Sequence, residues 1–203
     1  MMRRWMRAAV LTVALTAVSC GGAGAGDDHA SVSITAAPEI TRWIDLAGIE
    51  IPVGTVDGPD NGEWEPFNGF SHSPQGAALA AITQSVQLAT ASDRTWTTIL
   101  PGVAAPNEGR DLYAANRALV TIDGTDPDMV PEIVGYTFGE YSDTAATVNI
   151  VQRFSDDSLA ASSTQVVWID DDWRLDLSAA DEATITALDE LPSDLVNLEE
   201  TRK

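Results

Sequence analysis

The chain has 203 residues and a formal net charge of −20 at pH 7, with 31 acidic residues against 11 basic ones. This length fits one domain with additional terminal segments better than two full domains. The hydrophobic share of 44% is sufficient for a packed core. Because so acidic a protein repels nucleic acid and anionic lipid head groups, we expect no nucleic-acid partner.

The N-terminus has the pattern of an export signal. The basic segment MMRRWMR precedes the apolar run AAVLTVALTAV at residues 8–18, which is too short to span a bilayer as a mature helix. Cys20, the single cysteine, comes directly after this region and before two glycines. That placement resembles the lipobox of bacterial lipoproteins, although Ala17 stands where leucine is usual.

We therefore expect a signal peptide at residues 1–19 and a lipid anchor, including palmitate, at Cys20 on the outer face of the cell membrane. Cleavage after Ala25 in the sequence AGA is the alternative, and it would release a soluble secreted protein. All 31 acidic residues but only 8 basic ones follow Cys20, so the exported part carries a formal charge of −23. Without a further cysteine this part can form no disulfide and no zinc–thiolate site.

Residues 20–40 are rich in Gly and then in Ser, Thr and Ala, which is typical of a flexible tether. Ordered structure is expected from about Trp43. An edge strand is predicted at residues 49–53, because Pro52 cannot donate a hydrogen bond to a ladder. A turn-rich loop follows, and in it Trp64 is an aromatic candidate for an interaction surface.

The segment GFSHSPQGAALAAI contains the start of a helix. Ser73 and Pro74 have the pattern of an N-cap followed by the first helical residue. Apolar residues recur at helical spacing until about residue 92. Gly76 and the alanines beside it form a face of small residues, which predicts close packing against another element.

The same segment places His72 between two serines, which raises the hypothesis of a catalytic Ser–His group. It lacks the second glycine of a nucleophile elbow, and neighbours in sequence are not by that fact hydrogen-bonded partners. We therefore expect no catalytic residue. The remaining hypotheses are a histidine that packs and bonds to loop backbone, or a pocket or interaction site formed by Phe70, His72 and Gly76.

Residues 95–109 contain two prolines and are expected to form a connector. A second helix is predicted at about residues 109–122, because apolar residues share one face: Leu112, Ala115, Leu119 and Ile122. Beyond residue 130 the pattern alternates with a period of two. Three or four antiparallel strands joined by short turns are expected, bent at Gly135 and Gly139.

The C-terminal region at residues 179–203 is predicted to form a helix and a frayed tail. Ser178 and Asp181 match a capping box, and Ile185, Leu188 and Leu191 give an apolar stripe. Helices followed by a meander predict an α+β domain at residues 41–178, with helices packed on a curved antiparallel sheet. This order resembles the NTF2-like and cystatin-like cone fold and the periplasmic domains of VirB8-type conjugation proteins, a likeness that does not fix function.

The central region also resembles an uncharacterised domain family of actinobacteria. The residues that carry this resemblance are Trp43, Gly48, Pro52, Gly58, Pro59, Gly69, Phe70, His72, Pro74, Gly76 and Ala77. Members of that family are membrane-anchored or secreted, and some are linked to conjugative elements. The resemblance implies no catalytic residue, and Gly54 departs from it where serine is expected.

Two acidic clusters raise the question of a metal site, namely Asp123, Asp126 and Asp128, and the run Asp170 to Asp172. Neither has the ligand spacing of a calcium loop, so we expect solvated turns, no metal and no cofactor. The leading functional hypothesis is a non-enzymatic, lipid-anchored module that binds a partner protein in a conjugation or secretion apparatus. The alternative is a small-ligand-binding lipoprotein that uses the cavity of an NTF2-like cone.

Overall fold

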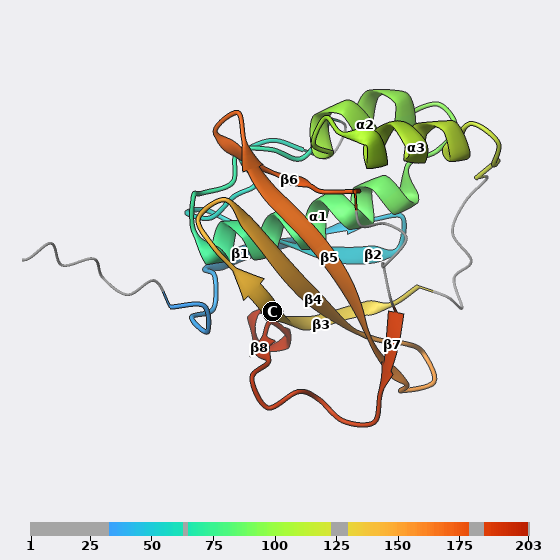
Figure 1. Cartoon of the computed structure of the whole chain (residues 1–203). Coiled ribbons are helices and arrows are strands. Elements are labelled where there is room, and N and C mark those ends of the chain that lie inside the picture. The colour runs from blue at the N-terminus through green and yellow to red at the C-terminus, as the bar shows by residue number, and fades with distance from the viewer. Residues whose placement is uncertain (1–32, 63–64, 123–129, 179–184, 203) are drawn as a thin grey trace, which may run out of the picture. The chain divides into compact units, whose positions relative to one another are not determined.

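The computed structural model describes residues 33–62, 65–122, 130–178 and 185–202. The predicted signal peptide, Cys20, most of the predicted tether, Trp64 and the first acidic cluster lie outside them. The helices are α1 (Pro74–Thr90), α2 (Trp96–Val103), α3 (Glu108–Arg117) and the 3-10 turn η3 (Glu199–Thr201). The strands are β1 (Ile40–Leu46), β2 (Ile49–Gly54), β3 (Glu132–Tyr141), β4 (Ala145–Arg153), β5 (Leu159–Ile169), β6 (Asp172–Leu175), β7 (Ile185–Leu188) and β8 (Val196–Asn197) (Figure 1).

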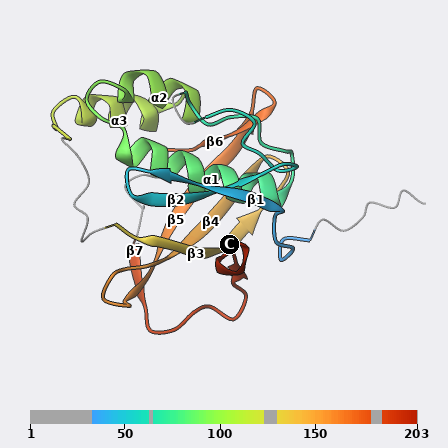
Figure 2. The same ribbon diagram turned by 180° about the vertical axis from the view of Figure 1, so that it is seen from behind.

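The first element is an antiparallel hairpin in which β1 pairs with β2. Its turn is made by Ala47 and Gly48, whose φ angles of 55° and 92° are left-handed; such angles suit the twist of a two-residue hairpin. The predicted strand at residues 49–53 is confirmed, and its proline, Pro52, lies opposite Trp43. Figure 2 shows this hairpin on the side of α1 that faces away from β4 and β5.

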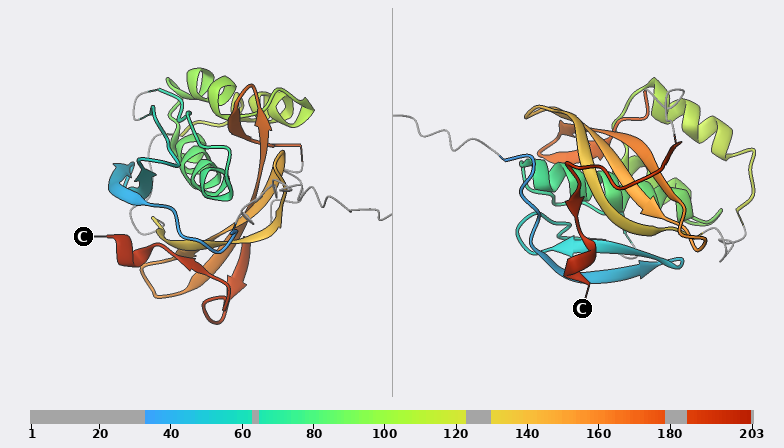
Figure 3. Two further views of the ribbon diagram at one scale, coloured as in Figure 1. Left: turned by 90° about the vertical axis from the view of Figure 1, so that its left-hand side faces the viewer. Right: turned by 90° about the horizontal axis from the view of Figure 1, so that it is seen from below.

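Helix α1 begins where the sequence predicts. Ser73 is extended, and its side-chain oxygen accepts a hydrogen bond from the backbone nitrogen of Gly76 at 3.0 Å. Thirteen of the 17 residues of α1 are buried, as expected of a helix that is apolar on every side. It contacts β1 and β2 on one side and β4, β5 and β6 on the other, and Figure 3 (left) shows it inside the curve of the sheet.

The large sheet is antiparallel, with strand order β6-β5-β4-β3-β8, and β7 also pairs with β5. The pairing of β3 with β4 shifts register between Ile133 and Gly135 and again between Phe138 and Glu140. These bulges lie at the two glycines from which bending is predicted, and bulges bend and twist a strand. The predicted meander is therefore confirmed, including the tight turn between β5 and β6 at Asp170 and Asp171.

Two predictions about the helical region are wrong. The expected connector contains α2, because Ile99, Leu100 and Val103 fall at helical spacing and are buried. Helix α3 ends at Arg117, and its predicted apolar face points to solvent: Leu112 is 53% exposed and Leu119, beyond the helix, is 86% exposed. The inward face carries Tyr113 and Arg117 instead, which bond to the carbonyls of Leu88 and Ala91.

The predicted C-terminal helix is also wrong in the described part. Residues Ile185–Leu188 form strand β7 and pair with the first residues of β5. Ile and Thr favour an extended backbone, and the free edge of β5 supplies hydrogen-bonding partners that a local pattern does not reveal. The chain then adds β8 beside β3 and ends its described part at η3, held by side-chain contacts rather than frayed.

One core joins the hairpin, α1 and the large sheet. Its largest fully buried side chains include Trp173, Tyr136, Phe67, Ile51 and Leu79. The α+β class, with helices on a curved antiparallel sheet, is confirmed. Tyr136 is 0% exposed and packs edge-to-face on Phe138 at 5.5 Å on the concave side of the core. Within the described residues, no helix combines the length and the apolar character needed to cross a membrane.

Candidate functional site

His72 lies on the surface and not in a cavity. Its ring is exposed and stacks on Trp168, with ring centroids 4.0 Å apart and planes 8° from parallel. Its Nε2 atom is 2.5 Å from the backbone oxygen of Asp143, in the β3–β4 turn. The prediction that His72 packs and bonds to loop backbone is confirmed, and the ring joins the segment before α1 to two strand ends.

The two serines beside His72 face a buried carboxylate. Ser71 and Ser73 donate from Oγ to Oδ1 of Asp57 at 2.7 and 3.0 Å, and the two hydroxyls lie 2.7 Å apart. Asp57 is only 9% exposed. Because Ser73 also caps α1, Asp57 lies beside the positive end of the helix dipole, where a negative charge is stabilised. The sequence pattern does not reveal that Asp57 bonds to the two serines, because Asp57 comes from the preceding loop.

A second buried carboxylate holds the same loop from the sheet. The Asp172 oxygens accept hydrogen bonds from the backbone nitrogens of Gly69 at 3.0 Å and Phe70 at 2.9 Å, more than a hundred residues away in sequence. Oδ1 also accepts from the backbone nitrogen of Trp173 at 2.9 Å. The sequence-based expectation that Asp170 to Asp172 form a solvated turn therefore holds for the first two residues but is wrong for Asp172, which is 8% exposed.

Two buried glutamines of α1 complete the support of the loop. Gln84 donates to the carbonyls of Phe67 and Trp173 at 3.1 and 2.9 Å. Gln87 accepts from the nitrogen of Phe67 at 2.9 Å and donates to the oxygen of Glu65 at 2.7 Å. Polar side chains on an otherwise apolar, largely buried helix are the sequence signal that could have identified them, because buried amides require partners.

Phe70 and Gly76 lie in the interior, whereas His72 lies on the surface. Phe70 is 4% exposed. A Cβ atom on Gly76 would lie 2.0 Å from the carbonyl oxygen of Ser71, so the close approach at Gly76 is to the segment just before α1. The neighbouring Trp173 donates from Nε1 to the same Ser71 oxygen at 3.0 Å. Phe70 and Gly76 are thus buried beneath the segment that leads into α1, whereas His72 lies on its exposed side.

This geometry does not form the nucleophile–base pair of a serine hydrolase. That pair needs a hydrogen bond between a serine hydroxyl and an imidazole nitrogen. Here the hydroxyls of Ser71 and Ser73 contact Asp57 and each other, whereas the imidazole of His72 contacts the carbonyl of Asp143. Within the described residues, no group of three or more His, Cys, Asp or Glu side chains is placed to hold a metal ion.

A chain of aromatic contacts runs inward from His72. Trp168 meets Trp173 at 5.5 Å, Trp173 meets Tyr141 at 6.3 Å, and Tyr141 meets Phe138 at 5.6 Å. At its inner end the hydroxyl of Tyr136 is buried without a hydrogen-bond partner. Burial, together with the nearby charge of Asp57, raises the pKa of this phenol well above its usual value, so it stays protonated.

A hollow of about 360 Å³ lies elsewhere, between the hairpin and the loop that follows it. Arg42, Asp60 and Glu65 provide charged groups there, and Ile44 and Phe67 provide part of an apolar wall. Its volume is at the lower end of the range of small-ligand pockets. It is separate from the concave face of the sheet, where the sequence-based hypothesis placed a cavity.

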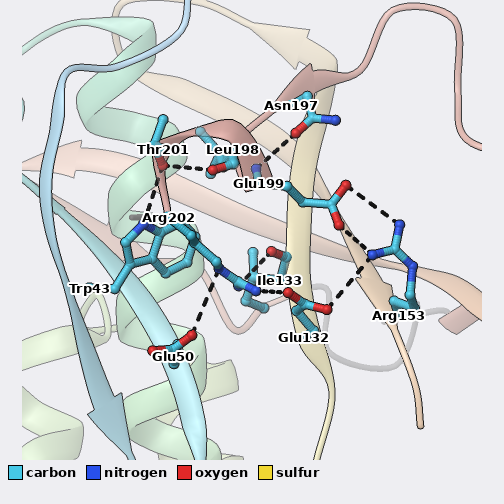
Figure 4. A network of polar contacts seen from close by, with 10 residues as sticks. All are labelled: Trp43, Glu50, Glu132, Ile133, Arg153, Asn197, Leu198, Glu199, Thr201 and Arg202. Carbon is cyan, nitrogen blue, oxygen red and sulfur yellow. Dashed lines mark hydrogen bonds and ion pairs between the residues drawn. The ribbon is translucent and has the colours of Figure 1, made fainter.

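A second polar cluster, which we call the C-terminal clasp, joins the β1–β2 hairpin, β3 and β4 to the last described residues (Figure 4). Arg202 contacts Glu132, donates to the carbonyl of Ile133 at 2.8 Å and lies 3.9 Å from a carboxylate oxygen of Glu50. Arg153 contacts Glu199 and lies 3.7 Å from Glu132. Sequence reasoning missed this cluster because its members come from four distant segments.

Comparison with known proteins gives a family but no function. Residues 9–194 match the model of a family described as "Domain of unknown function (DUF8175)". The matched range includes Cys20, most of the apolar run before Cys20, and the loop around His72. It ends before the last residues of the clasp. No curated protein and no solved structure matches the chain.

Proposed function

The chain belongs to the DUF8175 family, and from that premise we propose that it is an exported, lipid-anchored interaction module without enzymatic activity. The export signal and the position of Cys20 support the first part of this proposal. The resemblance to actinobacterial proteins linked to conjugative elements supports a role as an accessory of a conjugation or secretion apparatus. In that role the tether would give the domain reach from the membrane.

The observation that carries the non-enzymatic part is the internal use of the motif's polar groups. Ser71 and Ser73 bond to Asp57, and His72 bonds to the Asp143 carbonyl. Asp172 is engaged with backbone nitrogens. These bonds stabilise a loop on the sheet, and among the described residues of this loop no nucleophile, base and oxyanion donor converge.

Exposed apolar residues on α3 and just beyond it support an interaction role. Leu112, Leu119 and Val120 are 53%, 86% and 56% exposed. Single exposed apolar residues are common, but several on one short segment are a feature of protein-binding surfaces. This segment lies on the outer side of the domain in every view (Figures 1 to 3).

Two experiments test the proposal. Detergent phase partitioning of membranes from the native host should place the wild-type protein in the detergent phase and a Cys20→Ala variant in the aqueous phase. Wild-type protein in the aqueous phase would show that the lipid anchor is wrong.

Chemical cross-linking in intact cells, followed by purification, should recover a defined partner protein; recovery of the protein alone would contradict the interaction role.

A further inference from the structure

Within the described part of the chain, the outer edge of β7 offers backbone hydrogen-bonding groups that no other strand uses. β7 pairs along one side with Leu159–Ser162 of β5, and no other described strand pairs with it. Among the described residues, no backbone or side-chain hydrogen bond reaches Ile185–Leu188 from the opposite side. Figure 1 shows β7 at the margin of the sheet. An edge of this kind is a template on which another strand can pair.

The side chains of β7 are largely exposed to solvent, as is the outer edge of its backbone. Ile185 is 73% exposed, Thr186 and Ala187 are exposed, and Leu188 is half-buried. A partner strand could therefore cover Ile185 on one face of the extended sheet without any rearrangement of the core. Burying a large aliphatic side chain contributes favourably to association, in addition to the ladder hydrogen bonds.

Carboxylates gather at one end of this edge. Asp189 and Glu190 follow β7 directly and are exposed. The pairing places Leu188 opposite Leu159, and Leu159 follows the β4–β5 turn, which carries the exposed Asp156 and Asp157. Four carboxylates thus lie within three residues, along the chain, of the paired residues Leu188 and Leu159.

This charge pattern selects among the strands that could pair there. A second copy of the chain would bring the same carboxylates together if its β7 paired in parallel, and in any orientation the two chains would repel, because the residues after Cys20 carry a formal charge of −23. Like charges at an edge are a device that prevents self-pairing, and the same charges attract a partner with cationic side chains. The exposed apolar residues near α3 lack such a pattern, so they do not specify what covers them.

We propose that β7 is a docking edge for an extended, lysine- or arginine-containing segment of a partner protein, which adds a strand to the large sheet. This inference rests on the proposed role as an interaction module and names the chemistry of the partner. Main-chain bonds to β7 would give affinity, and pairing of the basic groups with Asp189 and Glu190 would give specificity.

A peptide titration tests the edge directly. The probe is a short synthetic peptide of alternating valine and threonine with lysine at both ends, added at up to millimolar concentration to the isotope-labelled exported chain. The expected result is amide shifts confined to β7 and the adjoining part of β5, absent for a peptide N-methylated at alternate residues. Shifts elsewhere, or none, would overturn the proposal.

Charge reversal tests the specificity. A double variant, Asp189→Lys with Glu190→Lys, should weaken the lysine-ended peptide about tenfold and favour a glutamate-ended one. The control pair Glu39→Lys with Glu140→Lys makes the same charge change at exposed positions on other elements and should leave affinity within about twofold. If both double variants weakened peptide binding equally, the effect would come from net charge alone, and this would contradict the docking edge.

Cross-linking in cells separates this proposal from the one on which it rests. If wild type and the Asp189→Lys, Glu190→Lys variant capture the same partner equally, the interaction role stands and β7 is not the docking edge. If wild type captures none, the interaction role fails, and the peptide titration still decides whether the edge accepts a basic strand.

Discussion

Arg202 lies over the ring of Trp43, with its guanidinium carbon 4.1 Å from the ring centroid. Trp43 belongs to the first strand of the domain and Arg202 is the last described residue, so the clasp closes the domain across nearly its whole sequence. The indole nitrogen of Trp43 also donates to Oγ1 of Thr201 at 3.2 Å. The hairpin is thereby fixed to the large sheet by polar and cation–π contacts in addition to its apolar packing.

Replacement of Arg202 tests the contribution of the clasp. An Arg202→Ala variant should lose about 1–2 kcal/mol of unfolding free energy, because a partly desolvated cation–π contact and charge-assisted hydrogen bonds disappear together. Urea unfolding followed by tryptophan fluorescence gives the value. Arg94→Ala, at an exposed position, should change it by less than about 0.5 kcal/mol. Equal effects of the two variants would mean that the clasp does not stabilise the fold.

Asp172 provides a second test, at the loop of the candidate site. In Asp172→Asn, an amide group replaces one carboxylate oxygen that faces backbone N–H donors. The expected loss is about 1–3 kcal/mol, the cost of leaving buried donors without acceptors. Amide hydrogen exchange at Gly69 and Phe70 should accelerate as well. Asp171→Asn, one residue earlier in the exposed turn, is the matched control, and similar behaviour of both variants would contradict the anchoring role.

The elements that the sequence predicts correctly are those with strong local signals. The start of α1 follows from Ser73 and Pro74, and the bends of β3 follow from Gly135 and Gly139. The failures occur where packing overrides the local pattern. The leucines at 112 and 119 predict an inward face, but Arg117 turns inward because its guanidinium finds Asp93 and the carbonyl of Ala91.

The candidate site could be predicted only in part. The sequence predicts that His72 packs and bonds to loop backbone, because it lies in the loop just before a helix start. Its partners do not, since Trp168 and Asp143 reach it through the topology of the sheet. The burial of Asp172 could not be predicted for the same reason, because aspartates in a run near a turn are ordinarily solvated.

Gly76 gives a test in which helix propensity and packing predict opposite signs. Alanine is more favourable than glycine inside a helix by about 1 kcal/mol, so propensity alone predicts that Gly76→Ala stabilises. The contact of 2.0 Å between a new Cβ and the Ser71 oxygen predicts a net loss of about 1–3 kcal/mol instead. Thermal unfolding distinguishes the two. Gly139→Ala, where the nearest atom is a flexible Thr147 methyl at 3.3 Å, should be tolerated far better.

Replacement of His72 separates stacking from hydrogen bonding. His72→Phe keeps a ring on Trp168 but removes the bond to the Asp143 carbonyl, whereas His72→Ala removes both. We expect the alanine variant to lose about 1 kcal/mol and the phenylalanine variant about half of that. Urea unfolding measures both losses, and near-ultraviolet circular dichroism reports the environment of Trp168. A larger loss in the phenylalanine variant would show that the ring stack contributes little.

Acid should loosen the attachment of α3 once the pH falls below the ordinary pKa of an aspartate. The hydrogen bond from Arg117, together with that from the backbone nitrogen of Ile122, holds the pKa of Asp93 below its ordinary value of 3.8. A lowered pKa in the folded state means that this stabilisation is complete above 3.8 and is lost as the pH falls through the lower, folded-state value. Hydrogen exchange at Ile122, measured from neutral pH to below that point, should therefore show a relative loss of protection. Asp93→Asn should remove this pH dependence, and Asp194→Asn, at an exposed position, should retain it. If protection at Ile122 in wild type and in Asp93→Asn falls in parallel, the ion pair does not hold the helix.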